Sequence, residues 1–462
     1  MPFTRQAKTR PPRLRPPDYV EERAGQVLLV WGDVPYWTVV DRDGYALLRL
    51  LDGGQTVEGI LAGHPAWQAE RRAIAQMLET LWRAGVLEDG RPVPIPKVEA
   101  PRIENVALNL TRQCNLRCKF CYNLPYLTGE DAGELTAEEM IAFLKAARPL
   151  TGKAPTLTTL GGEPLLYPEK LLAVSAAAKR MGYSLLVSTN GTLVTDDFAR
   201  RARQLGLQVQ VSIDGPTAEV NDRVRGKGAF ERIRRGIETL VRHRAYTIIS
   251  MVCHRGNLAD LEAFFAFAAA LGVQEARFIP LKRLGGGADG GFTPVPLPEL
   301  LQAAYGLFTR RPDYRRFFGR DALSILATTC RFSARRPSCG TGLQTVLLDA
   351  DGALYPCLNT NRPEFRIANV RDPGFDFPRL WQSSPLLDHV RRCTAIAGAD
   401  HPHAACPVRY WCLAGCRGEN YAHTGHLDAR SPDCAALKRG IITMFWLLAE
   451  RPELGKPAAK VC

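Results

Sequence analysis

Residues 105–285 alternate between short apolar runs and longer segments in which apolar residues recur every three or four positions. The short runs predict β-strands, and the longer segments predict amphipathic α-helices. Strands and helices that alternate in this way predict an α/β fold with a parallel sheet and right-handed crossovers. The strands are expected at 105–111, 156–160, 184–189, 207–213, 246–252 and 275–281, and the helices at 136–148, 168–181, 195–205, 229–243 and 258–271. Because six units are too few for a closed eight-stranded barrel, we expect an open, partial (β/α)6 barrel of the TIM type.

The first ninety residues carry a different pattern. Two apolar, β-rich runs, Gln26–Trp31 and Tyr36–Val40, flank a Gly-Asp-Val-Pro turn and predict a hairpin. Three helical patterns follow, and Gly85 ends the last of them. This order predicts a small, winged-helix-like α+β domain at residues 18–90. Its helices are expected at 45–51, 56–62 and 69–84.

The boundaries of the other segments follow from composition. Four prolines indicate a linker before the barrel, and one helix is expected near 297–310 after it. The cysteine-rich loops beyond that helix are too short to owe their order to an apolar core. The expected segments are a basic flexible tail at 1–17, the linker at 91–101, the barrel at 102–290, a bridging helical region at 291–329, a cysteine-rich domain at 330–440, and a C-terminal helix and tail at 441–462.

Composition indicates an ordinary globular chain. Of its 462 residues, 46% are hydrophobic and 23% are charged, which suits a soluble protein with full cores. No apolar run approaches the roughly 18 residues that span a membrane. The basic amino terminus is not followed by an apolar segment, so we expect no secretory signal and a cytoplasmic location.

The formal net charge of +13 raises the question of acidic partners. Such a charge is typical of proteins that bind nucleic acid, anionic lipid or an acidic ligand. The basic residues are spread along the whole chain, however, and only the first fifteen positions are dense in them. This distribution favours a solvated basic surface over a nucleic-acid-binding face.

The thirteen cysteines are unevenly placed. None precedes residue 114, three lie within eight residues, and eight lie between 330 and 434. Disulfides are rare in the cytoplasm, so clustered thiols there indicate metal or cluster ligands.

Cys114, Cys118 and Cys121 directly follow the strand expected at 105–111, where a barrel of this type places its chemistry. A [4Fe–4S] cluster has four irons, each of which takes one external ligand. Three thiolates in one loop therefore hold such a cluster and leave one iron open. Structural zinc is the alternative, but it needs four ligands, and no fourth Cys or His lies near the loop in sequence.

Four motifs in order make the chain resemble the radical S-adenosylmethionine (SAM) superfamily, whose signature is CxxxCxxC after the first strand. Gly-Gly-Glu-Pro at 161–164 ends the second strand and resembles the family's GGEP motif, which meets the SAM amino group. Ser-Thr-Asn-Gly at 188–191 and Ser-Ile-Asp-Gly-Pro at 212–216 end the next two strands, at positions that contact the ribose and carboxylate of SAM. The resemblance implies that the SAM-binding residues are Tyr122, Gly161, Gly162, Glu163, Ser188, Asn190, Ser212, Asp214 and Arg225, the last as a carboxylate clamp.

The resemblance also implies an activity. SAM would chelate the open iron, and one electron from the reduced cluster would break its sulfonium bond to give methionine and a 5′-deoxyadenosyl radical. That radical abstracts a hydrogen atom from the substrate, while the protein binds, orients and excludes water. An electron donor such as flavodoxin or ferredoxin is implied. No residue is assigned as a general acid or base.

The second cysteine group resembles the SPASM domain, which carries two auxiliary [4Fe–4S] clusters in other radical SAM enzymes, so three clusters are expected in all. Zinc held by four of these thiolates is the alternative. The resemblance assigns three cysteines to cluster I and adds Cys330 less directly; the three are Cys339, Cys357 and Cys416. It assigns three more to cluster II, namely Cys406, Cys412 and Cys434.

The chain departs from the SPASM pattern at one position. The family has a cysteine three residues before Cys406, where this chain has His403. Histidine ligates iron in some clusters, so His403 and Cys393 are equal candidates for the last ligand of cluster II. A structural histidine beside an open iron is the third possibility. Cys253 and Cys462 are expected to be ordinary thiols.

The amino-terminal domain resembles the PqqD-like peptide-recognition domain of enzymes that modify ribosomal peptides. The resemblance rests on TVVDRDGYALLRLLDGGQTVEGIL and the closing LWRAGVLE. In that family a leader peptide adds a strand to the hairpin edge beside a helix. DNA-binding folds share the layout, but the last helix here carries only Arg71, Arg72 and Arg83 as cations.

Three functions follow, in order of preference. The first is a peptide maturase that binds the leader of a precursor peptide and modifies its core. An oxidation that forms a thioether or carbon-linked crosslink, with the auxiliary clusters as electron acceptors, is favoured, and epimerisation or another outcome stays open. The second is a radical SAM/SPASM enzyme for a non-peptide substrate such as a tetrapyrrole, or for a folded protein, as in sulfatase maturation. The third, a non-catalytic metal-bearing nucleic-acid-binding protein, leaves the SAM motifs unexplained.

Overall fold

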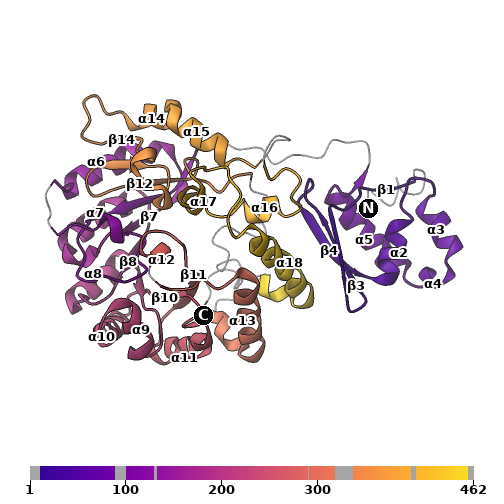
Figure 1. Ribbon diagram of the computed structural model, residues 1–462, viewed down its shortest axis with the longest axis horizontal. Helices are drawn as coiled ribbons and strands as arrows, with labels where there is room; N and C mark the ends of the chain where they lie inside the picture. Colours follow the sequence, from indigo (N-terminus) through magenta and orange to yellow (C-terminus); the bar gives the residue numbers. More distant parts are fainter. Residues whose placement is uncertain are drawn as a thin grey trace.

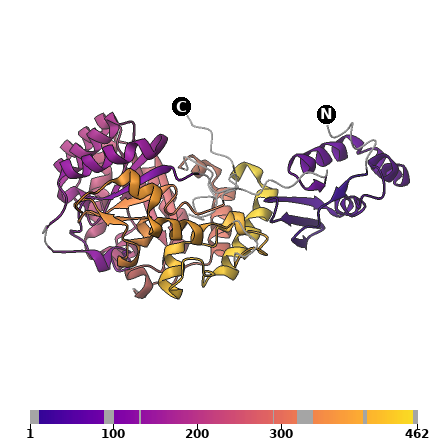
Figure 2. The ribbon, with the colours of Figure 1, turned by 90° about the horizontal axis from the view of Figure 1, so that it is seen from above.

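The computed structural model describes residues 11–88, 100–129, 133–289, 291–317, 337–396 and 402–455. Figure 1 shows the amino-terminal unit at one end of the long axis and the barrel at the other, and the same separation is visible from above in Figure 2. Most of the expected linker, together with Cys330 and Cys462, lies outside the described residues. Over the described ranges, no helix has the length and apolar character needed to cross a membrane.

Six parallel strands form the barrel sheet, as the sequence predicts, and they neighbour one another in chain order. Helices α6 to α8, α10 and α11 alternate with them along the chain, so the expected partial barrel is confirmed. The strands are β6 (Ile103–Asn109), β7 (Thr151–Leu160), β8 (Ser184–Thr189), β9 (Gln208–Ser212), β10 (Thr247–Cys253) and β11 (Glu275–Pro280). The helices are α6 (Ala137–Ala147), α7 (Pro168–Arg180), α8 (Asp196–Leu205), α10 (Ala229–Arg242) and α11 (Leu261–Leu271).

Local sequence signals explain where these helices begin and end. Thr136 and Glu139 form a capping box at the start of α6, and the Thr195 side chain accepts a hydrogen bond at the start of α8. Gly206 ends α8 in the left-handed conformation, with φ +65°. The helices pack on the strand side chains that face them, which are buried. Because the six strands are parallel neighbours, their carboxyl ends meet at one edge of the sheet.

The barrel sheet continues into the cysteine-rich segment. Strand β12 (Thr345–Leu348) pairs in parallel with β6, and β13 (Ala353–Tyr355) and β14 (Ala368–Asn369) follow antiparallel, so the sheet has nine strands. The sequence predicts the turn between β12 and β13 but not their place beside β6. The other helices after the barrel strands are α12 (Gly286–Asp289), α13 (Leu297–Arg310), α14 (Phe377–Ser383), α15 (Pro385–Thr394), α16 (Arg409–Cys412), α17 (Arg417–Thr424) and α18 (Cys434–Glu450). Helix α18 thus runs through the boundary expected at residue 441.

The amino-terminal unit contains a three-stranded antiparallel sheet rather than the hairpin alone. Strand β2 (Tyr19–Arg23) pairs with β3 (Gln26–Trp31), which pairs with β4 (Tyr36–Asp41). The sequence does not predict β2, because three of its five residues are charged and no apolar alternation stands out. Within the expected tail, β1 (Arg13–Leu14) pairs with β5 (Leu87–Glu88) and closes the unit. The helices are α2 (Arg42–Arg49), α3 (Val57–Gly63), α4 (Pro65–Gln68) and α5 (Arg71–Arg83).

This sheet is covered on both faces. Val27, Leu29 and Trp31 of β3 pack with the helices of the unit itself. Leu28 and Val30, which point the other way because side chains alternate along a strand, belong to the core that includes α18. A continuous run of apolar residues in β3 is the sequence signal of such two-sided burial.

Aromatic side chains form the contact between the two units. The rings of Trp37 on β4 and Phe445 on α18 stack at a centroid distance of 4.6 Å, and Trp411 of α16 meets Phe445 edge-on at 5.1 Å. The indole nitrogen of Trp446 donates to Glu21 at 3.1 Å. Figure 1 shows α16 and α18 between the barrel and the amino-terminal sheet. The amino-terminal unit is therefore docked on the cysteine-rich segment.

Candidate functional site

The first cysteine loop leaves the carboxyl end of β6 and brings its three thiols together. Burial raises the pKa of the Cys121 thiol to about 11, and the thiolates of Cys118 and Cys114 add to the rise. Burial raises the pKa of Cys118 as well, but the Arg225 guanidinium, 3.8 Å from its sulfur, opposes this. Iron ligation needs thiolates, so a positively charged iron centre would offset this unfavourable environment.

The two glycines of the GGEP motif let the backbone of the cysteine loop pack against the end of β7. A Cβ on Gly162 would lie 1.9 Å from the carbonyl oxygen of Gln113, and one on Gly161 would lie 2.4 Å from that of Thr111. The Gly162 amide donates to the Thr111 carbonyl at 2.8 Å, and the Glu163 amide to the Gln113 carbonyl at 2.7 Å. The resemblance implies that these glycines bind SAM, and the structure shows that they also permit close contact between two backbone segments.

The Glu163 carboxylate is fully buried and faces the end of β8. It accepts hydrogen bonds from the Thr189 hydroxyl at 2.6 Å, the Asn190 amide at 2.7 Å and the Leu165 amide at 2.9 Å. Burial raises its pKa, and these donors oppose the rise. Sequence reasoning missed Thr189, although it lies inside the Ser-Thr-Asn-Gly motif. Glu163 therefore ties the ends of β7 and β8 together.

The predicted residues at the next two strand ends lie along the same edge. Ser188 and Ser212, at the ends of β8 and β9, are each partly exposed. The Asn190 side chain donates to Asn115 in the cysteine loop at 2.8 Å. Tyr122 is half-buried and packs on the other side of the loop, with apolar residues of the cysteine-rich segment. Burial raises its pKa.

Asp214 and Arg225 form a buried ion pair behind the cysteine loop. Arg225 ends α9 (Ala218–Arg225), a helix that the sequence analysis did not predict, and its Nε lies 2.7 Å from an oxygen of Asp214. The other Asp214 oxygen accepts from the Val252 amide at 3.0 Å. Burial lowers the pKa of the Arg225 guanidinium, whereas the nearby Asp214 carboxylate raises it. The net result is a raised pKa. The pair leaves an Nη of Arg225 beside Cys118, so this guanidinium is fixed by protein contacts.

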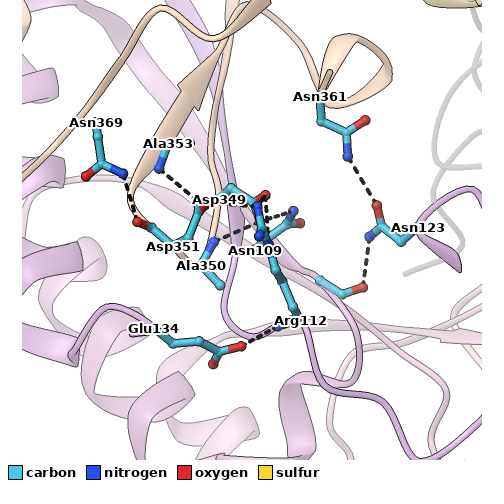
Figure 3. A network of polar contacts seen from close by, with 11 residues as sticks. Asn109, Arg112, Asn123, Glu134, Asp349, Ala350, Asp351, Ala353, Asn361 and Asn369 are labelled. Carbon is cyan, nitrogen blue, oxygen red and sulfur yellow. Dashed lines mark hydrogen bonds and ion pairs between the residues drawn. The ribbon is translucent and has the colours of Figure 1, made fainter. Parts of the chain in front are cut away.

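A polar network fastens the cysteine loop to the turn after β12 (Figure 3). Buried Asp349 accepts from the Asn109 amide at 2.8 Å and from the Arg112 guanidinium at 2.5 Å, and Arg112 also lies 3.0 Å from Asp351. The Glu134 carboxylate accepts from the Arg112 backbone amide at 2.7 Å. The sequence analysis interpreted residues 349–352 only as a turn. A buried aspartate beside the first cysteine loop was not apparent from the sequence.

Asn123 extends the link between the two cysteine-bearing segments. Its side chain donates to the Gly161 carbonyl at 3.1 Å, and the Asn361 amide approaches its oxygen at 3.4 Å (Figure 3). Asn361 follows Cys357 by four residues. The loop of the first cysteines is thus held against both the GGEP turn and the second cysteine group.

The cysteines assigned to cluster I by resemblance lie together. The thiolates of Cys416 and Cys339 both raise the pKa of buried Cys357, although burial is the larger cause. The Cys416 sulfur accepts from the Asn359 amide at 3.4 Å and from Lys282 Nζ at 3.6 Å. The sequence analysis did not single out Lys282, which follows β11. Cys330 is outside the described residues.

The cysteines assigned to cluster II form a second group beside α16 and α18. Burial raises the pKa of Cys412 to about 12, with further contributions from the thiolates of Cys406 and Cys434. His403 is buried, and its carbonyl accepts from the Cys406 amide at 2.9 Å, which places it in the same turn. Cys393 lies on α15 with its sulfur 3.6 Å from His389 Nε2. Cys253 is buried in the barrel core.

The three groups of thiols are of a kind that can hold iron–sulfur clusters. Over the described ranges, no three His, Cys, Asp or Glu side chains converge closely enough to bind one metal ion. A [4Fe–4S] cubane takes one thiolate on each of several irons, so its ligands need not converge on one point. Three thiols at one strand end and two further groups of three suit such centres.

Comparison with known proteins agrees with this geometry. Residues 108–268 match the model of the radical SAM superfamily. Mycofactocin maturase MftC of Mycobacterium ulcerans (strain Agy99) is 31% identical over 70% of this chain and 86% of its own length. The chain therefore belongs to the radical SAM superfamily. It is an enzyme of a class that uses SAM and a [4Fe–4S] cluster, and it is related to SPASM-containing peptide maturases.

A second relative is the AdoMet-dependent heme synthase of Methanosarcina barkeri (strain Fusaro / DSM 804), which is 29% identical over 74% of this chain and 98% of its own length. Among solved structures, Streptococcus suis SuiB bound to precursor peptide SuiA has a TM-score of 0.57 at 14% identity, and the match covers 92% of this chain and 98% of that one. The match covers 92% of this chain, whereas residues 100–462 alone are less than four fifths of it. The shared fold must therefore include much of the amino-terminal unit.

Proposed function

We propose that the chain is a radical SAM maturase of a ribosomally made precursor peptide, whose leader binds to the amino-terminal unit. The observation that carries the proposal is where this unit sits. Its sheet packs on α16 and α18, which carry Cys412 and Cys434. A peptide held by the unit would enter the enzyme beside the cysteine-rich segment. SuiB, which shares the fold, is a protein whose structure includes a bound precursor peptide.

The radical chemistry is proposed for the strand edge where the first cysteine loop lies. When bound, SAM and the cluster supply a 5′-deoxyadenosyl radical that takes a hydrogen atom from the substrate. The chain's part is to hold the loop: Glu163 joins two strand ends, and Asp349 fixes Arg112. The residues proposed to hold the first cluster are Cys114, Cys118 and Cys121, and those proposed for SAM are Tyr122, Gly161, Gly162, Glu163, Ser188, Asn190, Ser212, Asp214 and Arg225.

We assign seven of the other thiols to two auxiliary clusters that accept electrons during oxidation of the peptide. The assignment is supported by the two groups of three thiols described above. His403 is the better candidate for the fourth ligand of cluster II, because it shares a turn with Cys406. The proposed ligands are Cys339, Cys357, Cys416 and Cys330 for cluster I, and Cys406, Cys412, Cys434 and His403 for cluster II.

The leader is proposed to pair with β4. Strand β3 is the central strand of the described three-stranded sheet, so β2 and β4 are its edge strands. Strand β2 carries Glu21, Glu22 and Arg23, and charged side chains on an edge discourage strand pairing. Strand β4 has five half-buried residues and only one exposed residue, Asp41, so it offers an apolar edge for β-augmentation.

The test compares two edge valines. Val40→Glu places a charge on β4, and Val20→Glu places the same charge on β2, where Val20 is 43% exposed. We expect Val40→Glu to weaken binding of a labelled peptide encoded beside this gene by about tenfold or more, equivalent to about 1.4 kcal/mol. Val20→Glu should bind as the wild type does. Equal binding by both variants, or no binding of such peptides by the wild type, would refute the peptide proposal.

A tetrapyrrole substrate is the second candidate, favoured by the likeness to the heme synthase over almost its full length. Here the amino-terminal unit would not select the substrate. Formation of 5′-deoxyadenosine would then be stimulated by a carboxylated tetrapyrrole and not by the peptide, and Val40→Glu would leave this stimulation unchanged.

A further inference from the structure

A cation lies beside one of the cysteines proposed for cluster I. Lys282, just beyond β11, places its ammonium 3.6 Å from the Cys416 sulfur. Lys282 and Cys416 also line one cavity of about 150 Å³ between the end of β11 and the start of α18. The cation comes from the end of the barrel sheet, and the sulfur comes from the cysteine-rich segment.

Lys282 meets sulfur rather than a carboxylate. No carboxylate of the described chain lies within ion-pair distance of its ammonium. The Glu419 carboxylate is instead engaged by the Arg283 amide at 2.9 Å. The ammonium therefore faces the Cys416 sulfur.

Such cations act on the redox equilibrium of a cluster. A thiolate-bound [4Fe–4S] cluster is an anion, and one-electron reduction makes it more negative. Positive charge and hydrogen bonds at its sulfurs favour the reduced form and raise the potential.

We propose that Lys282 is a positioning residue that raises the reduction potential of the cluster held by Cys339, Cys357 and Cys416, which suits that cluster to accept an electron. This inference rests on the proposed cluster I. It adds a role for a residue that the cysteine pattern does not reveal.

The test is an anaerobic, EPR-monitored dithionite titration of the reconstituted full chain. Cys114→Ala, Cys118→Ala and Cys121→Ala together remove the first cluster, and the signal lost on adding Cys357→Ala belongs to cluster I. In this background Lys282→Met removes the charge and Lys282→Arg keeps it. We expect Lys282→Met to shift the equilibrium of that signal about tenfold toward the oxidised form, or about 59 mV for one electron. Lys282→Arg should match the parent.

Lys438→Met is the matched control, because Lys438 lies near Cys406 rather than Cys416. It should leave the cluster I signal in place. An unchanged midpoint in Lys282→Met at full iron content, or an equal shift in Lys438→Met, would overturn the inference and leave the proposed cluster intact. If Cys357→Ala removes no EPR signal, the proposed cluster I itself is refuted.

Discussion

At the scale of single residues, Gly162 and Asp349 determine where the first cysteine loop lies. Gly162 leaves room for the loop backbone, and Asp349 binds the guanidinium of Arg112, two residues before Cys114. Neither contact involves a thiol. Protein groups other than the cysteines therefore help to hold the loop in place.

Gly162→Ala should displace the loop, because the added Cβ would lie 1.9 Å from the Gln113 carbonyl oxygen. We expect a loss of about 1–3 kcal/mol in the free energy of unfolding and less iron bound on reconstitution. Gly63→Ala is the control, since a Cβ on Gly63 meets nothing within 4 Å. Chemical denaturation and iron analysis measure both effects. Wild-type stability and iron content in Gly162→Ala would contradict this account of the loop.

Asp349→Asn should destabilise the fold by about 2–3 kcal/mol, because it removes charge from a buried acceptor of Arg112 and Asn109. The neighbouring Asp351 also meets Arg112, but its side chain is 41% exposed. Asp351→Asn should therefore cost less than about 1 kcal/mol. Urea denaturation of the two variants gives the comparison, and equal losses would argue against the buried pair as the main fastening.

One exposed ion pair gives a pH dependence with a defined sign. Arg371 lowers the pKa of Glu139 from 4.5 to about 2, so the pair stabilises the folded state fully above pH 4.5. This stability is lost as pH falls from 4.5 toward 2. Arg371→Gln should thus be less stable than the wild type at pH 7, and the two should converge on acidification. If the difference in free energy of unfolding between the wild type and Arg371→Gln grows at low pH, the predicted sign of this pH dependence is wrong.

At the scale of elements, the contact between β4 and α18 joins the amino-terminal unit to the rest of the chain. Trp37→Ala removes the ring that stacks on Phe445. We expect the amino-terminal unit to be cleaved several-fold faster in limited proteolysis while the barrel stays resistant, since packing at this contact is lost. Trp67→Ala removes the same side chain from α4, where it stacks on His64. It should leave the contact unchanged, and equal cleavage of both variants would count against the docking role of Trp37.

At the scale of the whole molecule, the first quantities to measure are iron, sulfide and reductive SAM cleavage in the anaerobically reconstituted chain. About twelve irons per chain, with formation of 5′-deoxyadenosine, would support three cubane clusters. About four irons would leave only the first cluster. In Cys114→Ala the cleavage should vanish while about eight irons remain.

Removal of iron should loosen the segment that links the two units. The thiols of Cys412 and Cys434 lie on α16 and α18, which contact the amino-terminal sheet. Treatment with a chelator should therefore raise hydrogen exchange in these helices and in β4 more than in β8 or β9, because ligation and folding are coupled. Uniform exchange in the loaded and depleted proteins would argue against clusters in this segment.

The sequence by itself determined the barrel and the identity of its chemistry. Apolar periodicity predicted six parallel strands because helix and strand repeats are local properties. The first cysteine loop and the motifs at successive strand ends were equally local, since each is a short run with fixed spacing. For the same reason the sequence identified α5 and the hairpin of the amino-terminal unit, but not β2, whose charged residues conceal its single packed face.

Only the tertiary structure decided which distant residues meet. Asp349 lies beside Arg112 because β12 joins the barrel sheet next to β6, and a pairing between strands so far apart in sequence leaves no local signal. The packing of the second face of β3 against α18 was also not predicted, because the two elements are far apart in sequence. Lys282 reaches Cys416 across 134 positions of the chain. Local patterns specify elements and ligand types, whereas long-range packing specifies the charges that surround those ligands.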